Sequence, residues 1–292
     1  MDQREVMPRV AFQGERGAFS EEAAVELLGE HIQLVPRPTF ESLFAAIDEK
    51  AADYLLAPVE NSLAGSVHRS YDLLLESSLH ISSEVVIPIR HFLIGCSGSS
   101  FESIKTVESH PVALAQCERF FAAHPQFQRM ATEDTAGSVA RVVRQGDRTR
   151  AAIAGLLAAN LYGGVVLREH LEDHAENYTR FVLLAPPTNI SAGRGRQAGS
   201  PLGVVDANKL SLVLKLPHKG GALHHALEPF ARRGIDLVKI ESRPIKGRPW
   251  EYHFYLDLQA STSDAEVINA LAELEERAMD VRVLGCYPSA AR

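Results

Sequence analysis

The chain opens with a short apolar run, a polar turn and an amphipathic stretch. Val10–Phe12 is the apolar run, Gly14 and Gly17 lie in the turn, and Ser20 precedes a segment rich in alanine and leucine. Glycine favours turns, and serine favours the position just before a helix. The pattern predicts a strand, a glycine turn and a helix.

The same rhythm continues as far as residue 184. Apolar side chains in 40–47 recur at i, i+3, i+4 and i+7, as on one face of a helix, and a short apolar run follows at 54–57. Strands that alternate with helices indicate an α/β protein whose parallel or mixed sheets are covered by helices. Further strands are expected at 85–89, 91–95, 165–167 and 181–184, and further helices at 111–124, 136–145 and 151–162.

The composition changes after residue 184. The segment 186–208 is rich in proline and glycine, holds few large apolar side chains and is expected to be a linker. The remaining residues follow the order βαββαβ in about 80 residues, the size of one small ferredoxin-like domain. Its strands are expected at 210–216, 235–245, 250–258 and 281–287, and its helices at 222–233 and 264–279.

Three local signals refine this second domain. Trp250 begins an alternation that places apolar side chains on one buried face of a strand. Ser263 and Glu266 have the spacing of a capping box at the start of the last helix. Pro229 lies inside the earlier helix and should kink or shorten it.

Composition and charge exclude several classes of protein. With 46% hydrophobic and 23% charged residues the chain is an ordinary globular protein, and a net charge of −7 argues against binding nucleic acid or an anionic membrane by bulk charge. The N-terminus lacks a signal-peptide core, and the apolar stretch 151–167 is shorter than the roughly 20 residues that a membrane span needs. We therefore expect a cytoplasmic protein, in which any attraction for an anion is local.

The sequence gives no sign of a metal or a cofactor. Cys96, Cys117 and Cys286 have no paired spacing and are expected to be core thiols in a reducing compartment. His170 and His174 are four residues apart, but no third ligand is fixed near them. Glycine-rich nucleotide motifs and the nucleophile elbow are absent from the sequence, so none of these chemistries is expected.

Four polar clusters interrupt the apolar pattern where strands meet helices or turns. Such positions hold ligands in α/β proteins because free backbone N–H groups at helix starts attract anions. Helix capping alone, for example by Ser109, would also explain these residues. In the last cluster Thr179 offers a hydroxyl, and Arg180 offers a planar cation suited to a carboxylate. The clusters are 58–66, 108–116, 134–138 and 177–181.

Taken in order, these clusters resemble the prephenate dehydratase family, including its plant arogenate dehydratase relatives. The resemblance rests on the motifs FQG, GAFS, PVENSLAGSVHRSYDLL, SHPVALAQC, DTAGS, AAIAG and NYTRF. The later motifs LP, GAL, KIESRP and VLGCY resemble the ACT regulatory domain that follows the catalytic region in that family. The resemblance implies a two-lobed α/β catalytic region with a cleft like that of periplasmic binding proteins. It spans 7–185, with one lobe at 7–88 and 168–185 and the other at 89–167, and is followed by a linker at 186–208 and a ferredoxin-like ACT domain at 209–292.

The resemblance implies an enzyme of phenylalanine biosynthesis, a carbon–oxygen lyase that converts prephenate to phenylpyruvate without a cofactor. Thr179 matches the family's essential threonine. Its hydroxyl is too weakly acidic to give up a full proton, so we expect it to donate an oriented hydrogen bond to the leaving hydroxyl. The carboxylate of Glu60 would repel an anionic substrate, so Glu60 must be either protonated or turned to hold Asn61 or a backbone group. The catalytic candidates are Thr179, Arg180, Phe181, Glu60, Asn61, Ser62, Ser109, Gln116 and Thr135, and the substrate-binding candidates are Gly65, Ser66, His110 and Asn177.

In the ACT domain the resemblance implies an allosteric site for phenylalanine at an interface between subunits, in a homodimer or homotetramer. His224 stands where the family usually has an apolar residue. Two alternatives stay open: an arogenate dehydratase that yields phenylalanine directly, and a non-catalytic sensor of small molecules. The expected phenylalanine-binding residues are Pro217, Gly221, Ala222, Leu223, Glu241, Ser242, Arg243 and Pro244.

Overall fold

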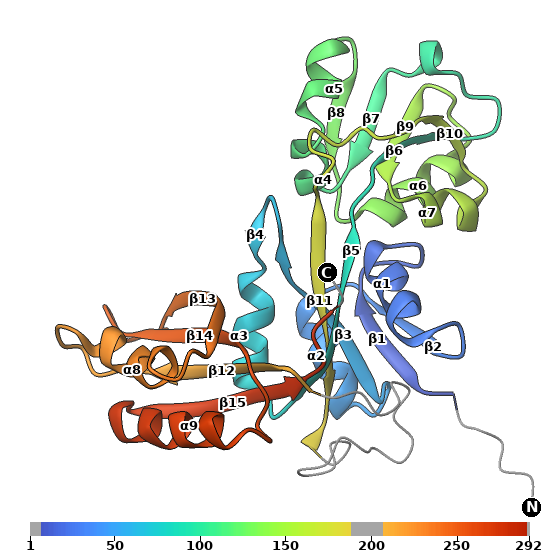
Figure 1. Ribbon diagram of the computed structural model, residues 1–292. Coiled ribbons are helices and arrows are strands. Elements are labelled where there is room, and N and C mark those ends of the chain that lie inside the picture. The colour runs from blue at the N-terminus through green and yellow to red at the C-terminus, as the bar shows by residue number, and fades with distance from the viewer. Residues whose placement is uncertain (1–6, 188–206, 291–292) are drawn as a thin grey trace, which may run out of the picture. The chain divides into compact units, whose positions relative to one another are not determined.

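The computed structural model describes residues 7–187 and 207–290, which form three sheets (Figure 1). The expected linker at 186–208 lies almost wholly outside the described residues. The chain divides into two compact units, one of Met1–Ser77 with Val85–Val182 and one of Ser78–Glu84 with Leu183–Arg292. The α/β class is confirmed: a region with two mixed sheets precedes a smaller antiparallel one.

The first sheet has the strand order β2-β1-β3-β11-β5, with the short β4 paired to β3. Strand β1 runs parallel to both β2 and β3, which fits the βαβ pattern predicted for the first 60 residues. Its strands are β1 (Arg9–Gln13), β2 (Gln33–Arg37), β3 (Tyr54–Asn61), β4 (Gly65–Ser66), β5 (His80–Pro88) and β11 (Tyr178–Ala185), and the helices between them are α1 (Phe19–Leu28), α2 (Phe40–Asp48) and α3 (His68–Glu76).

The second sheet has the strand order β10-β6-β9-β7-β8 and buries both of its faces. Alternation along the strands places Ile94 in the core that includes α6 and α7, and its neighbour Leu93 in the core that includes α4 and α5. The strands are β6 (Phe92–Gly95), β7 (Thr106–Ser109), β8 (Gln128–Ala131), β9 (Arg150–Ala154) and β10 (Val165–Arg168). The helices are α4 (Pro111–Ala115), α5 (Glu118–Ala123), α6 (Thr135–Gln145) and α7 (Leu156–Tyr162), with a 3₁₀ turn at Phe101–Ser103.

Two helices predicted in this region are wrong in extent. The helix expected at 151–162 begins only at Leu156, because the alanine-rich start is the central strand β9, paired with β6 on one side and β7 on the other. Pairing on both edges outweighs the helix propensity of alanine, and Gly155 separates the two elements. The helix expected at 111–124 is two helices, α4 and α5, that break at Gln116 and Cys117.

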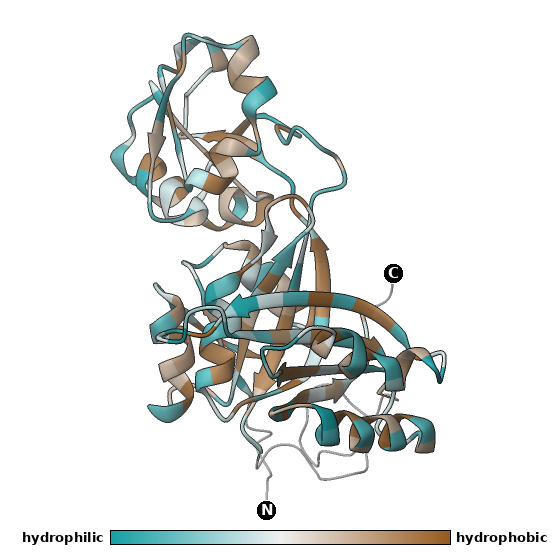
Figure 2. Cartoon of the chain, turned by 90° about the vertical axis from the view of Figure 1, so that its left-hand side faces the viewer, coloured by the Kyte–Doolittle hydropathy of each residue, from teal (hydrophilic) through white to brown (hydrophobic). Residues whose placement is uncertain are grey.

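The third sheet confirms the ferredoxin-like order βαββαβ. Its strand order is β13-β14-β12-β15, each neighbouring pair is antiparallel, and α8 and α9 contribute to one core against it. In Figure 2 the ribbon of α9 alternates between hydrophilic and hydrophobic residues along its length, as expected of a helix with one buried face. The elements are β12 (Lys209–Lys215), α8 (Ala222–Ala231), β13 (Asp236–Pro244), β14 (Tyr252–Gln259), α9 (Ala265–Arg277) and β15 (Asp280–Tyr287).

The helix α8 continues past Pro229 to Ala231. Proline has no N–H, so the carbonyl of His225, four residues earlier, loses its helical donor. Arg277 supplies a substitute, since its Nη1 donates to that carbonyl at 2.6 Å. The partner on α9 thus satisfies the group that Pro229 would otherwise leave without a hydrogen bond.

Two further details of this domain differ from the predictions. Trp250 is not part of the buried strand, because its backbone adopts a φ of 67° before β14 begins and the residue is 74% exposed. The cap of α9 is Asp264, whose carboxylate accepts from the backbone N–H of Glu266, whereas the hydroxyl of Ser263 bonds that of Ser261.

A buried ion pair joins β12 to β5 within the second unit. Nζ of Lys209 lies 3.0 Å and 2.9 Å from the two carboxylate oxygens of Glu84, and the two side chains are only 11% and 3% exposed. The same carboxylate accepts from the backbone N–H of Ala290. Gly285 on β15 lies so close to β5 that a Cβ there would come within 2.2 Å of the carbonyl oxygen of Ile81.

Removing one member of this pair should destabilise the second unit. We expect Lys209→Met to lower its free energy of unfolding by about 3–5 kcal/mol, because the Glu84 carboxylate would remain buried without the charge of its lysine. Adding Glu84→Gln should recover part of the loss, since a neutral amide costs less to bury. Urea unfolding followed by circular dichroism measures both effects. Lys219→Met, at an exposed position, is the matched control, and equal stability of the two single variants would contradict the prediction.

Candidate active site

The end of β3 and the start of β11 are neighbours in the first sheet (Figure 1). Ser62 links the two strand ends by hydrogen bonds. Its backbone N–H donates to the carbonyl of Tyr178 at 2.8 Å, and its hydroxyl donates to the carbonyl of Glu176 at 2.9 Å. The same hydroxyl accepts from the backbone N–H of Tyr178 at 2.9 Å. Asn61, which ends β3, is thereby held against Thr179 of β11.

The side-chain amide of Asn61 has one orientation only. Its Oδ1 accepts from the backbone N–H groups of Leu63 at 3.0 Å and Ala64 at 2.8 Å, and such groups can only donate. Its Nδ2 therefore faces β11, where it donates to the carbonyl of Tyr178 at 3.0 Å and to Oγ1 of Thr179 at 2.9 Å. Because the Thr179 oxygen accepts here, its own hydrogen is directed elsewhere and can be donated to a third group.

Asn177 adds a second donor beside Thr179. Its Oδ1 lies 2.8 Å from Nδ2 of Asn61, whose two hydrogens are shared among this oxygen, the Tyr178 carbonyl and Oγ1 of Thr179. The Nδ2 of Asn177 therefore points away from Asn61. That Nδ2 is buried and makes no hydrogen bond to any residue that the structure describes. A buried donor without a partner costs about 1–3 kcal/mol, which a bound ligand would offset.

Strand alternation separates Arg180 from Thr179. Successive residues of a strand point to opposite faces, so Thr179 lies on the face of Asn61 and Arg180 lies on the face of Glu60. Nη1 of Arg180 is 3.4 Å from Oε2 of Glu60, and the arginine side chain is 12% exposed. Glu60 is therefore directed toward a cation, a partner that differs from the Asn61 amide or backbone group expected for it.

Gln116 reaches the same cluster from the second sheet. It caps the C-terminal end of α4, and its Nε2 lies 3.4 Å from Oδ1 of Asn61. Its Oε1 lies 2.8 Å from Nε2 of His91, a buried residue that the sequence analysis did not single out. The available signal was a polar residue at the start of the apolar run 91–95. Burial lowers the pKa of His91, only partly opposed by the Gln116 bond and by Glu172, so the ring is neutral near pH 7.

Three other candidates serve local structure. Ser109 ends β7 and donates its hydroxyl hydrogen to the carbonyl of Ile153 at 2.6 Å, so it does not cap α4. The cap of α4 is His110, whose Nδ1 accepts from the backbone N–H of Val112. Burial lowers the pKa of His110. Thr135 is the first residue of α6, and the cap there is Asp134. The hydrogen bonds of the described residues do not join these three to Asn61.

The remaining candidates frame the cluster. Gly65 and Ser66 form β4, which folds back onto Asn61 and Glu60. Phe181 is buried in β11. Within residues 7–187 and 207–290, no group of three histidine, cysteine or acidic side chains is arranged to hold a metal ion. None of the helices in those ranges combines the length and apolar character needed to cross a membrane.

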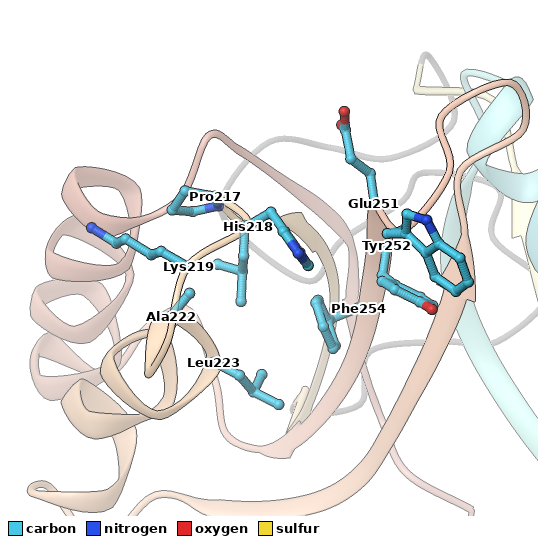
Figure 3. Close-up of a pocket in the computed structure, with 10 residues that line it drawn as sticks. Pro217, His218, Lys219, Ala222, Leu223, Glu251, Tyr252 and Phe254 are labelled. Atoms are coloured by element: carbon cyan, nitrogen blue, oxygen red, sulfur yellow. The ribbon is translucent and has the colours of Figure 1, made fainter.

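A pocket of about 150 Å³ lies in the second unit, between the start of α8 and β14 (Figure 3). Figure 3 shows Leu223 and the ring of Phe254 directed toward the pocket, whereas the Glu251 carboxylate points away from it. Gly221 has a φ of 79° just before α8, a conformation that suits glycine. The lining residues are Leu216, Pro217, His218, Lys219, Ala222, Leu223, Trp250, Glu251, Tyr252 and Phe254.

The structure gathers one half of the predicted phenylalanine site and not the other. Pro217, Ala222 and Leu223 line the pocket. The segment from Glu241 to Pro244 forms the end of the edge strand β13 and does not line this pocket in the described chain. The aromatic side chains of β14 are lining residues that the sequence analysis did not include.

Comparison with known proteins covers nearly the whole chain. The family model for prephenate dehydratase matches residues 10–189, and the model for the ACT domain matches residues 211–276. Arogenate dehydratase 2 of Petunia hybrida is 41% identical over 295 residues, which cover 96% of this chain and 72% of the relative. A bifunctional chorismate mutase/prephenate dehydratase of Neisseria gonorrhoeae is 36% identical over 282 residues, covering 96% of this chain and 74% of the relative.

A solved structure agrees with this family as well. The prephenate dehydratase of Arthrobacter aurescens in complex with L-Phe is 30% identical, with a TM-score of 0.83, over 96% of this chain and 89% of that one. The NYTRF strand β11 lies within the range that the prephenate dehydratase model matches, and the ACT match begins in β12 and ends in α9. The chain belongs to the prephenate dehydratase family and carries an ACT domain.

Proposed function

We propose that this protein catalyses the decarboxylative dehydration of prephenate to phenylpyruvate, a carbon–oxygen lyase reaction. The observation that carries the proposal is the hydrogen bond from Asn61 to Oγ1 of Thr179, which leaves the threonine hydrogen available to a substrate. Family membership supports the reaction class, and the printed names of relatives include both prephenate and arogenate dehydratases.

The chemistry needs a donor at the leaving group. The bond from the ring to its carboxylate breaks and releases carbon dioxide, and its electron pair enters the ring as the ring becomes aromatic. The carbon–oxygen bond breaks in the same process with its electrons on the departing hydroxyl oxygen, and the loss of both groups is what makes the ring aromatic. Hydroxide leaves poorly, so a hydrogen bond from Thr179 that strengthens as this charge develops lowers the barrier. Nδ2 of Asn177 is a second donor in the same cluster.

The electrostatics of the cluster suit an anionic substrate in an acidic protein. Asn61, Asn177, Thr179 and Gln116 are neutral, and the neutral ring of His91 adds no charge. The substrate therefore meets preorganised dipoles, which cost little reorganisation in the transition state. The role predicted for Arg180 in binding a substrate carboxylate stays a prediction.

The direct test is turnover by the purified protein. We expect the wild type to form phenylpyruvate from prephenate, and we expect Thr179→Val to lower kcat by about 10²–10⁴ with a small change in KM, because valine keeps the shape and removes the hydroxyl. Thr179→Ser, which restores a hydroxyl, should retain far more turnover than valine does. Unchanged kcat in Thr179→Val would contradict the mechanism.

A parallel assay distinguishes the alternatives. Formation of phenylalanine from arogenate at a higher kcat/KM than phenylpyruvate from prephenate would make the protein an arogenate dehydratase with the same donor. Turnover of neither substrate would contradict the enzymatic function and favour a non-catalytic sensor.

For the ACT domain we propose that the pocket between α8 and β14 binds L-phenylalanine as the regulatory ligand. The support is the aromatic lining by Tyr252 and Phe254, the left-handed backbone of Gly221 before α8, and the L-Phe complex named for the Arthrobacter aurescens structure. A ligand that binds two conformations unequally shifts their populations, which would let it alter turnover.

This site carries its own reporter, because Trp250 is the only tryptophan in the chain and lines the pocket. We expect L-phenylalanine, and not L-alanine, to change the tryptophan emission in a saturable way and to raise the melting temperature. Ala222→Met should abolish both responses by filling the pocket, whereas Ala231→Met at the exposed end of the same helix should keep them. An unchanged emission and melting temperature in the wild type would refute the site.

A further inference from the structure

A line of side-chain hydrogen bonds runs from Thr179 into the second sheet. It passes from Asn61, at the end of β3, to Gln116, at the end of α4, and then to His91. His91 lies on the segment between β5 and β6, where the chain crosses from the first sheet to the second. The bond between Gln116 and Asn61 therefore links the end of β3 in the first sheet to α4, which packs against the second sheet, and His91 is the last residue of this line.

The proton positions along this line follow from backbone donors. The N–H groups of Leu63 and Ala64 make Oδ1 the acceptor end of Asn61. The end of Gln116 that faces this oxygen must donate, so it is Nε2, and its Oε1 faces His91. Nε2 of His91 must then carry the hydrogen of the neutral ring, because Gln116 offers it an acceptor.

The backbone of His91 is fixed to the returning crossover segment. Its N–H donates to Oε2 of Glu172 at 2.8 Å, and its carbonyl accepts from the N–H of Leu171 at 2.9 Å. The residue is 1% exposed, and its ring packs edge-on against Phe19 at a centroid distance of 5.8 Å. The imidazole thus has a single place and a single direction for its donor.

The other ring nitrogen of His91, Nδ1, is buried and makes no hydrogen bond to the residues that the structure describes. A leucine or phenylalanine in this position would avoid the cost of burying that nitrogen, about 1–3 kcal/mol. What an apolar residue could not supply is the hydrogen bond to Oε1 of Gln116.

We propose that His91 is a positioning residue for the dehydratase reaction: its Nε2–H orients Gln116, and Gln116 in turn steadies the Asn61 amide that directs the Thr179 hydroxyl. This proposal rests on the proposed function, because its kinetic consequence is an effect on turnover. A residue of this kind changes kcat more than KM, since it acts on the geometry of a donor used in the transition state.

The test compares replacements of His91 that place a donor nitrogen at different distances from Cα. The glutamine amide nitrogen lies as many bonds from Cα as imidazole Nε2, whereas that of asparagine lies one bond closer. We expect His91→Asn and His91→Leu to lower kcat by about 10–100-fold, because a small displacement of a donor used in the transition state is costly, and His91→Gln to recover most of it. Equal losses in all three variants, or unchanged kcat in His91→Asn, would overturn the proposal. His80→Leu, at a histidine outside the cluster, controls for general destabilisation.

A double-mutant cycle identifies the route. If His91 acts through Gln116, His91→Asn should lower kcat little further once Gln116→Leu is present, so the two effects are strongly non-additive. Fully additive effects would show that His91 acts by another path and would overturn the proposal.

A readout without turnover separates this proposal from the proposed function. We expect nitrogen-15 NMR of the wild type to show His91 as the Nε2–H tautomer, with a mixture of tautomers in Gln116→Leu. The opposite tautomer in the wild type would overturn the proposal even if the enzyme is active. Turnover of neither substrate, with the Nε2–H tautomer present, would refute the proposed function and with it the kinetic role of His91.

Discussion

The carboxamide of Asn61 is the interaction on which the rest of the site depends. Two backbone N–H groups donate to its oxygen and so fix its orientation. Its nitrogen then donates to residues at the start of β11. Each donor that is fixed in this way determines the next acceptor, so the direction of the Thr179 hydroxyl and the orientation of Gln116 follow from it. Such a network has few alternative arrangements, which is the preorganisation that a reaction with a poor leaving group requires.

The fold makes this interaction possible. Asn61 and Thr179 are separated by 118 positions in the sequence and meet because β3 and β11 are neighbours in one sheet. Alternation along both strands gives the sheet a neutral face, with Asn61 and Thr179, and a charged face, with Glu60 and Arg180. An acidic chain can therefore present uncharged donors to an anion while its nearest carboxylate is paired with a cation on the other side.

Much of this architecture follows from sequence patterns, and the exceptions have physical causes. The first βαβ unit and the order of the ACT domain were predictable, because their apolar periods are clear and each turn carries its usual residues. The strand β9 was not, since a run of alanines becomes a strand only through pairing with β6 and β7. The role of His91 could not be predicted from its neighbours in the sequence, because it depends on Gln116, which lies 25 positions further along the chain. Strand alternation alone predicts that Arg180 and Thr179 point to opposite faces of the sheet, provided that the position of β11 is known.

The central claim is that the Asn61 amide directs the Thr179 hydrogen toward the substrate, and Asn61→Asp tests it most directly. The replacement keeps an oxygen for the N–H groups of Leu63 and Ala64 but removes the donor to Thr179, whose hydroxyl would then turn and donate to the new carboxylate. The measurement is single-turnover kinetics with prephenate, alongside a melting curve. We expect the single-turnover rate of Asn61→Asp to be as low as that of Thr179→Val, in a protein that remains folded. A rate near that of the wild type would contradict it.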